Sequence, residues 1–216
     1  MKKRILLSIL VSMVLALVPA LSGAQVVNDP VLQNPVLPPN RIGFVNEFSG
    51  VFSGLTGKGA SDYVAGGGVY YSGLLRSSPI LALGIHAGIS GATSIDGYGD
   101  IIHGVIAGEG RLYLPMGPVV DIWGSVVLGL GFLQETWSTN NYYTEEGVTR
   151  TGPVFGAGAG IGWYLGPNLS VGGYFRLYRL LWNDGDYVNT LDDGAISEAD
   201  YYGLWWTLGG YVALHY

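Results

Sequence analysis

The sequence contains no cysteine, and only 12% of its 216 residues are charged, about half the share found in an ordinary soluble domain. Without cysteine the chain has no disulfide framework, no thiol nucleophile and no lipid-anchored amino-terminal cysteine. So little charge is not typical of an average cytoplasmic globule. Glycine, in contrast, is abundant: there are 36 glycines, and because they show no three-residue period, a collagen-like chain is excluded.

The apolar run near the amino terminus is too short to span a bilayer, which takes about 20 residues. It covers Ile5–Val18, follows Lys2-Lys3-Arg4 and precedes the small residues Ser22-Gly23-Ala24. This order predicts a secretory signal peptide over residues 1–24, with cleavage before Gln25. Cleavage would remove three of the ten basic residues and no acid, leaving 7 Lys+Arg against 16 Asp+Glu and a net charge of −9 instead of −6. Nucleic acid is therefore not an expected partner.

Residues 25–40 are rich in proline, with Pro30, Pro35, Pro38 and Pro39. Four prolines favour an extended segment without hydrogen-bond pairing. A periplasmic linker is the expected role, and a plug or a partner-binding strand is the alternative.

From Arg41 to Tyr216 the dominant hydrophobic period is two, which is typical of strands with one apolar face. Between Leu81 and Ile89, for example, leucine, isoleucine and alanine alternate with alanine, glycine and histidine. Eight such segments predict an all-β domain over residues 41–216. They are RIGFVNEFSGVFSG, YVAGGGVYYSGLLR, PILALGIHAGISG, IIHGVIAGEGRLYL, VVDIWGSVVLGLGFL, PVFGAGAGIGWYL, LSVGGYFRLYRL and YYGLWWTLGGYVALHY.

The connections between these segments alternate in length. Short and long connections then fall on opposite ends of an antiparallel array, as in an eight-stranded up-and-down transmembrane β-barrel with short periplasmic turns and long extracellular loops. The uncharged stretch Thr151–Phe175 is interpreted as a hairpin and not as a helix, because Pro167-Asn168 interrupts it and glycine alternates through it. The predicted tight turns are 76–79, 114–118 and 166–168, and the predicted long spacers are 55–62, 92–100, 134–150 and 182–200.

In such a barrel the apolar face meets lipid and the polar face points inward. Aromatic side chains are expected at the two interfaces of the lipid face: Phe52, Tyr63, Phe132, Phe155 and Tyr202 towards the loops, and Phe44, Trp163 and Tyr216 towards the turns. Twelve of the 16 acids fall in the long spacers. Solvation of loops is the expected role of these acids, and divalent-cation binding near anionic lipid headgroups is the alternative.

Charged side chains on the inner face must find partners, because unpaired buried charges are costly. The sequence predicts an internal salt-bridge network, with inward aromatic rings lying over glycines of neighbouring strands. The lumen is then packed or very narrow. The predicted network residues are Glu47, His86, Glu109, Arg111, Asp121 and Arg176.

Catalytic and cofactor motifs are absent. Gly57-Lys58 is followed by Gly59 where a phosphate-binding loop needs Ser or Thr, and the glycines of Gly156–Gly162 lack the dinucleotide-binding spacing. The three histidines lie on separate segments without zinc-site spacing. An enzyme, a metal and a cofactor are therefore not expected.

Over Arg41–Tyr216 the chain resembles the eight-stranded outer-membrane barrels of the OmpA transmembrane domain, OmpX/Ail and OmpW type. The terminal LGGYVALHY, with Leu208, Gly210, Val212, Leu214 and Tyr216, looks like the signal that the barrel assembly machinery recognises, although Phe is the usual last residue. The resemblance implies an exported, monomeric outer-membrane protein of a diderm bacterium whose partners are membrane lipids and that machinery.

The resemblance leaves three functions open. A narrow or gated channel for small or hydrophobic solutes is the first expectation, as in OmpW-like barrels. A surface interaction protein that acts through its acidic loops, as in OmpX/Ail-like barrels, and a structural envelope protein are the alternatives. The mixed charges of the lumen resemble the salt-bridge gate of OmpA.

Overall fold

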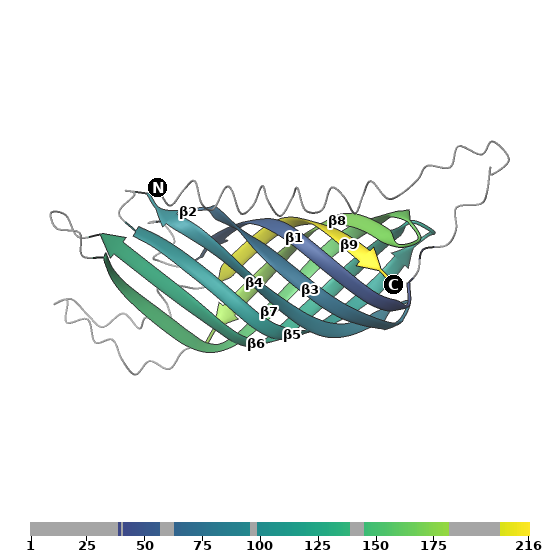
Figure 1. The fold of residues 1–216 in the computed structure, drawn as a ribbon, viewed down its shortest axis with the longest axis horizontal. Coiled ribbons are helices and arrows are strands. Elements are labelled where there is room, and N and C mark those ends of the chain that lie inside the picture. Colours follow the sequence, from purple (N-terminus) through teal and green to yellow (C-terminus); the bar gives the residue numbers. More distant parts are fainter. Residues whose placement is uncertain (1–38, 40, 57–62, 96–98, 139–144, 182–203) are drawn as a thin grey trace. The chain divides into compact units, whose positions relative to one another are not determined.

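The computed structural model describes residues 39, 41–56, 63–95, 99–138, 145–181 and 204–216 (Figure 1). The predicted signal peptide and all of the proline-rich segment except Pro39 lie outside the described residues. Both therefore remain predictions.

Strands make up almost all of the described chain. Their bounds are β1 Gly43–Leu55, β2 Tyr63–Val64, β3 Gly66–Ser78, β4 Leu81–Ser94, β5 Gly99–Met116, β6 Val120–Ser138, β7 Glu145–Gly166, β8 Leu169–Leu180 and β9 Trp205–His215. The short β2 and β3 both pair with β4 and are separated only by Ala65, so the wall contains eight strands. The described part of the chain has no helix with the length and apolarity needed to cross a membrane.

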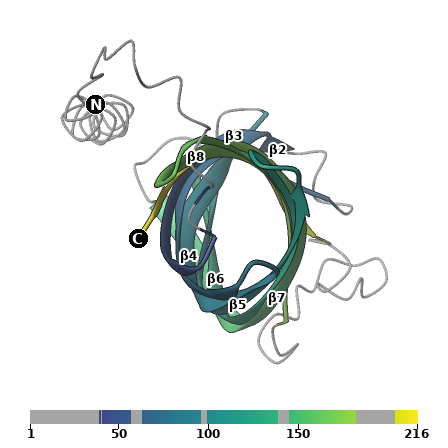
Figure 2. The same cartoon turned by 90° about the vertical axis from the view of Figure 1, so that its right-hand side faces the viewer.

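All strand pairs are antiparallel, and the sheet closes on itself (Figure 2). Each strand pairs with its neighbours in chain order, β9 returns to pair with β1, and the β4–β5 pairing completes the ring. A line drawn from Gly43 on β1 through successive register partners, once around the wall, returns to β1 at Ser53. The two positions are ten residues apart along the strand. With about 3.3 Å per residue and about 4.8 Å between strands, this stagger tilts the strands by about 40°.

The three tight turns match the sequence prediction closely, whereas two predicted spacers are shorter than expected. Strands β6 and β7 continue through most of the predicted spacer 134–150, from Ser138↔Glu145 down to Val120↔Trp163. The spacer 92–100 is shortened because β4 runs to Ser94 and β5 begins at Gly99. These strand ends are rich in polar residues, because beyond the lipid neither face of a strand needs to be apolar. The two-residue hydrophobic period is therefore lost there, and the sequence does not reveal that the strands continue.

The outer face of the wall is apolar, as the sequence predicts. Leu83, Ile85, Ile106, Leu128 and Leu130 are each at least 58% exposed in mid-strand positions. A face of this kind requires a lipid solvent or a covering partner.

Most of the expected interface aromatics point outward, namely Phe44, Phe52, Phe155, Trp163 and Tyr216. The prediction for Tyr63 was wrong. Its hydroxyl donates a hydrogen bond of 2.6 Å to Oε1 of the inward-facing Glu135, and its ring packs against the interior cluster. Its own strand is only two residues long, so alternation could not fix its face. Tyr202 lies outside the described residues.

Glycines on the inner face make room for the large interior side chains. A Cβ added to Gly88 would overlap the ring of its register partner Tyr70, and the same relationship joins Gly160 to Trp123. Tyr211 lies over Gly172 and Tyr178 over Gly156 in the same way. Large side chains therefore fit inside a narrow barrel because the opposing position has no side chain.

Candidate functional site: the barrel interior

A central layer of charged side chains crosses the barrel. Arg111 on β5 donates to both carboxylate oxygens of Glu47 on β1, at 2.7 and 3.2 Å, and to Oε1 of Glu109 at 2.8 Å. Arg176 on β8 reaches the same Glu109 oxygen at 2.7 Å. Two arginines and two carboxylates thus form a neutral cluster in which every charge has a partner, as burial requires.

Glu109 also holds the neighbouring polar side chains. Its second oxygen accepts a hydrogen bond of 2.8 Å from Ser72 on β3, and Ser72 lies 2.9 Å from Nδ1 of His86 on β4. The other ring nitrogen of His86 lies 2.8 Å from the hydroxyl of Tyr178. Five of the six predicted network residues therefore meet in this layer.

The sixth predicted residue, Asp121 on β6, belongs to a separate cluster at the turn end. It is paired with Arg76 at 2.8 Å and with Arg41 at 3.1 Å, and it accepts a hydrogen bond of 3.0 Å from Tyr164. The six predicted residues therefore fall into two ionic clusters, where the sequence predicted one network. Glu47 and Arg111 line the space between them, together with Trp123.

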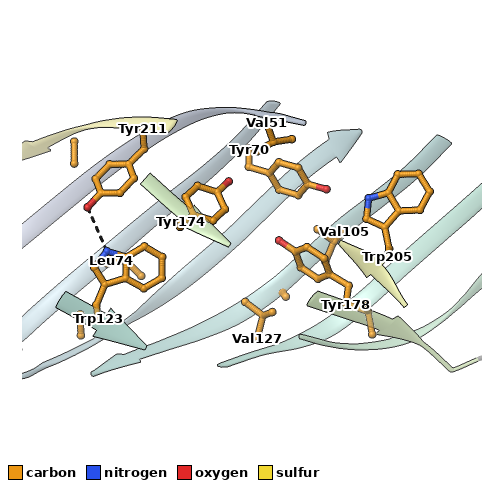
Figure 3. Close-up of a cluster of buried hydrophobic side chains, with 14 of the residues drawn as sticks. Val51, Tyr70, Leu74, Val105, Trp123, Val127, Tyr174, Tyr178, Trp205 and Tyr211 are labelled. Carbon is orange, nitrogen blue, oxygen red and sulfur yellow. Dashed lines mark hydrogen bonds between the residues drawn. The ribbon is translucent and has the colours of Figure 1, made fainter. Parts of the chain in front are cut away.

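Aromatic rings pack in the interior beside these clusters, and Figure 3 shows several of the rings. Tyr70, His86 and Tyr178 are stacked with ring centres 5.3 to 6.0 Å apart. The guanidinium of Arg111 lies 4.0 Å from the ring centre of Trp123, whose indole N–H donates to the Tyr211 hydroxyl, as Figure 3 shows. A void of about 10 Å³ remains beside these side chains, which is room for roughly one water molecule.

The loop half of the interior is more apolar. Ile101, Leu133 and Val154 are almost fully buried there. His103 is 1% exposed, stacks on Trp205, and has no hydrogen-bond partner on either ring nitrogen. The pair of Tyr63 and Glu135 lies towards the loop end of the same half.

Sequence reasoning missed several members of these clusters. Arg76 was assigned to a tight turn and Arg41 to the beginning of the domain, because both lie at the ends of predicted segments. Ser72 and Tyr164 have the correct alternation for the inner face, and this alternation could have identified them. Alternation does not give the distance between two inward side chains on opposite walls, because that distance depends on the stagger of the strands around the barrel.

The arrangement offers no assembled metal site: within the described ranges, no three His, Asp or Glu side chains converge on one point. Ser72, His86 and Glu109 are in contact, but Ser72 and Glu109 both approach the same ring nitrogen. A nucleophile–base–carboxylate relay needs the serine and the carboxylate on different nitrogens. Ser72, His86 and Glu109 therefore pack as one polar layer and do not form such a relay.

The predicted assembly signal forms the last strand and closes the barrel. Leu208, Val212 and Leu214 lie on the outer face of β9 together with Gly210, between β8 and β1. The backbone of Tyr216 exchanges two hydrogen bonds with Phe44, at 3.1 and 2.8 Å. The carboxyl terminus is thereby joined to the first strand.

Comparisons with solved structures agree with this geometry. Neisserial surface protein A (NspA) superposes with a TM-score of 0.56 at 11% identity, covering 81% of this chain and 97% of that one. Ail, the attachment invasion locus protein of Yersinia pestis, in complex with the heparin analogue sucrose octasulfate, superposes with a TM-score of 0.50 at 14% identity, covering 81% and 98%. The fold is that of an eight-stranded outer-membrane β-barrel. No family model matches the sequence, and no curated protein matches it either.

The interior of an eight-stranded barrel is narrow enough for side chains to fill it. The two ionic clusters and the stacked rings do so here. With sequence identities of 11% and 14%, these similarities concern the fold alone.

Proposed function

We propose that this protein is an integral outer-membrane barrel that is closed at rest and acts at its loop end. The apolar belt supports membrane residence, and the tight turns are assigned to the periplasm. The observation that carries the proposal is the central layer, in which Arg176 holds Glu109 and Arg111 holds Glu47 across the lumen. Ions would have to displace these side chains to pass. Under this proposal the membrane lipids and the barrel assembly machinery are its partners.

Charge indicates which partners the loop end could bind. Twelve acids lie in the predicted long spacers, and the eleven other than the inward-facing Glu135 would repel a polyanion. This differs from the ligand in the Ail structure, which is a heparin analogue. We propose instead a cationic partner, or anionic lipid headgroups joined through divalent cations.

Single-channel recording tests the closed state. The purified, refolded protein in planar bilayers is expected to give no stable openings on the nanosiemens scale. Stable openings of that size would overturn the proposal.

Cell adhesion tests the loop end. Cells that produce the protein with its spacer acids changed to Asn or Gln should adhere less to cationic surfaces than cells producing the unchanged chain, at equal surface amounts. Equal adhesion would contradict the interaction role and leave structural anchoring, which predicts only a change in envelope integrity on deletion.

A gated channel is the second candidate function, and the position of Arg111 is the observation that favours it. Its guanidinium contacts Glu47 and Glu109 at once, so it could move towards either carboxylate without becoming unpaired. Arg176 would have to move as well for a path to open, because it holds Glu109 independently. Brief openings that become longer in Arg111→Ala would support this candidate. Unchanged, silent traces in that variant would exclude it.

A further inference from the structure

One arginine crosses the turn-end mouth of the barrel. Arg41 precedes β1, yet its Nη2 donates a hydrogen bond of 2.8 Å to the carbonyl oxygen of Gly117 in the β5–β6 turn. Its Nε lies 3.1 Å from Asp121 on β6, and its guanidinium carbon lies 5.6 Å from the ring centre of Tyr164. Strand β6 is four strands from β1 in either direction. The contact therefore joins opposite walls.

Asp121 does not depend on Arg41 for its charge balance. Arg76 is paired with it at 2.8 Å and Tyr164 donates to it at 3.0 Å. Glu47, in contrast, is ion-paired among the described residues only to Arg111. Removing one partner from a buried pair is costly when the other charge is left alone. Departure of Arg41 leaves no carboxylate alone.

The charge count of the interior leads to the same conclusion. Among the described residues, the buried arginines and carboxylates without Arg41 are three of each: Arg76, Arg111, Arg176, Glu47, Glu109 and Asp121. The side chain of Arg41 is 19% exposed, against 1% for Arg76. Arg41 is thus the interior arginine that can exchange its protein partners for water at the lowest cost.

The void adjoins this contact, because Asp121 and Tyr164, the two side chains that Arg41 contacts, both line it. Asp121, Tyr164, Ser170 and His215 line it towards the turn end, and Arg111 and Trp123 line it towards the centre. Two of these lining residues have a buried side-chain atom without a hydrogen bond: Nδ1 of His215, and Oδ1 of Asp121, whose one ion-pair contact is with Nε of Arg41. A water molecule entering from the turn end would satisfy such groups.

We propose that Arg41 is a releasable latch over the turn-end mouth. Its release opens the chamber below Trp123 to solvent, while the layer of Arg111, Glu109 and Arg176 stays closed. The two ends of the lumen then open independently. This inference goes beyond the proposed function, because a barrel that never conducts can still have such a latch.

Thiol labelling tests the latch, since the chain has no cysteine of its own. Ser170→Cys places a thiol in the chamber, Asn168→Cys places one in the exposed β7–β8 turn, and Ser53→Cys places one in the buried loop half. Each is labelled with a small methanethiosulfonate reagent in folded protein, with Arg41 and with Arg41→Ala. The thiol at position 170 should react at least about tenfold faster in Arg41→Ala, as expected when a local opening becomes more populated.

The controls separate a latch from general loosening. The thiol at 168 should react fast in both backgrounds, and the thiol at 53 should react slowly in both. Arg41→Lys should be intermediate, because one ammonium cannot reproduce the geometry of a guanidinium between Gly117 and Asp121. Ala213→Cys, which lines the same void from β9, repeats the measurement in case Ser170→Cys disturbs its neighbours.

Three results would overturn the proposal. The first is an unchanged rate at position 170, repeated at position 213. The second is a rate at 53 that rises together with the rate at 170, which would mean that the whole interior loosens. The third is loss of the heat-modifiable folded band in Arg41→Ala, because a latch must be dispensable for the fold.

Discussion

Arg176 on β8 and Glu109 on β5 form an ion pair of 2.7 Å across the interior of the barrel, although 67 residues separate them in the chain. The same carboxylate holds Arg111 and Ser72. A single buried acid on β5 therefore links its own strand to β3 and β8, neither of which is its neighbour in the wall. Its removal should affect both stability and closure.

Glu109→Gln should lower the free energy of unfolding by about 3 kcal/mol, because two buried guanidinium groups lose their shared carboxylate. Asp100→Asn is the matched control, since Asp100 is an exposed acid on the same strand and its loss should change stability by no more than about 0.5 kcal/mol. Urea unfolding in detergent, followed by tryptophan fluorescence, measures both. Equal stabilities for the two variants would contradict the importance of the central layer.

Gly88→Ala should destabilise the barrel by about 1–3 kcal/mol, because the new Cβ overlaps the ring of Tyr70. Gly50→Ala should be nearly neutral, since nothing lies within 4 Å of a Cβ added there. Combining Gly88→Ala with Tyr70→Leu should cost less than the sum of the two single changes, which a double-mutant cycle in urea detects. Strict additivity would mean that the ring and the glycine do not depend on each other.

Val126→Arg tests the lipid face, because Val126 is 54% exposed near the middle of the membrane-facing part of β6. Placing an arginine there should cost about 2–4 kcal/mol in phospholipid bilayers. Thr149→Arg, on the outer face of β7 towards the loop end, should cost about 0–1 kcal/mol. Reversible folding into vesicles gives both values, and equal costs would place the bilayer elsewhere on the wall.

Tyr216→Ala should reduce assembly in cells several-fold, with little change in the stability of the refolded protein. The side chain is 64% exposed, so few interior contacts depend on it, whereas the proposed assembly signal ends on an aromatic ring. Tyr216→Phe should assemble normally. The folded fraction in outer-membrane extracts, compared with in-vitro folding yields, distinguishes the two effects; equal loss in both would assign the ring a purely structural role.

The alternation of apolar and polar residues was sufficient to predict eight strands, the faces of most of their residues and the closed barrel, because a lipid solvent imposes one rule on every membrane-spanning strand. It also placed Glu109, Arg111 and Arg176 on the inner face. It could not pair them, because pairing across the lumen depends on the ten-residue stagger between Gly43 and Ser53, which arises from the register of all eight strands together. Arg41 and Arg76 were missed for a related reason: residues at strand ends have no neighbours on both sides to reveal their face.

The unequal strand lengths have a consequence for how the molecule meets its surroundings. Pro153 accepts the hydrogen bond from Leu181 just beyond the end of β8, and β7 extends eight residues past that point, to Glu145. Eight residues span about 26 Å along the strand. If the loop end faces outward, as proposed, an antibody or another cell would meet the described ends of β6 and β7 before any other described strand.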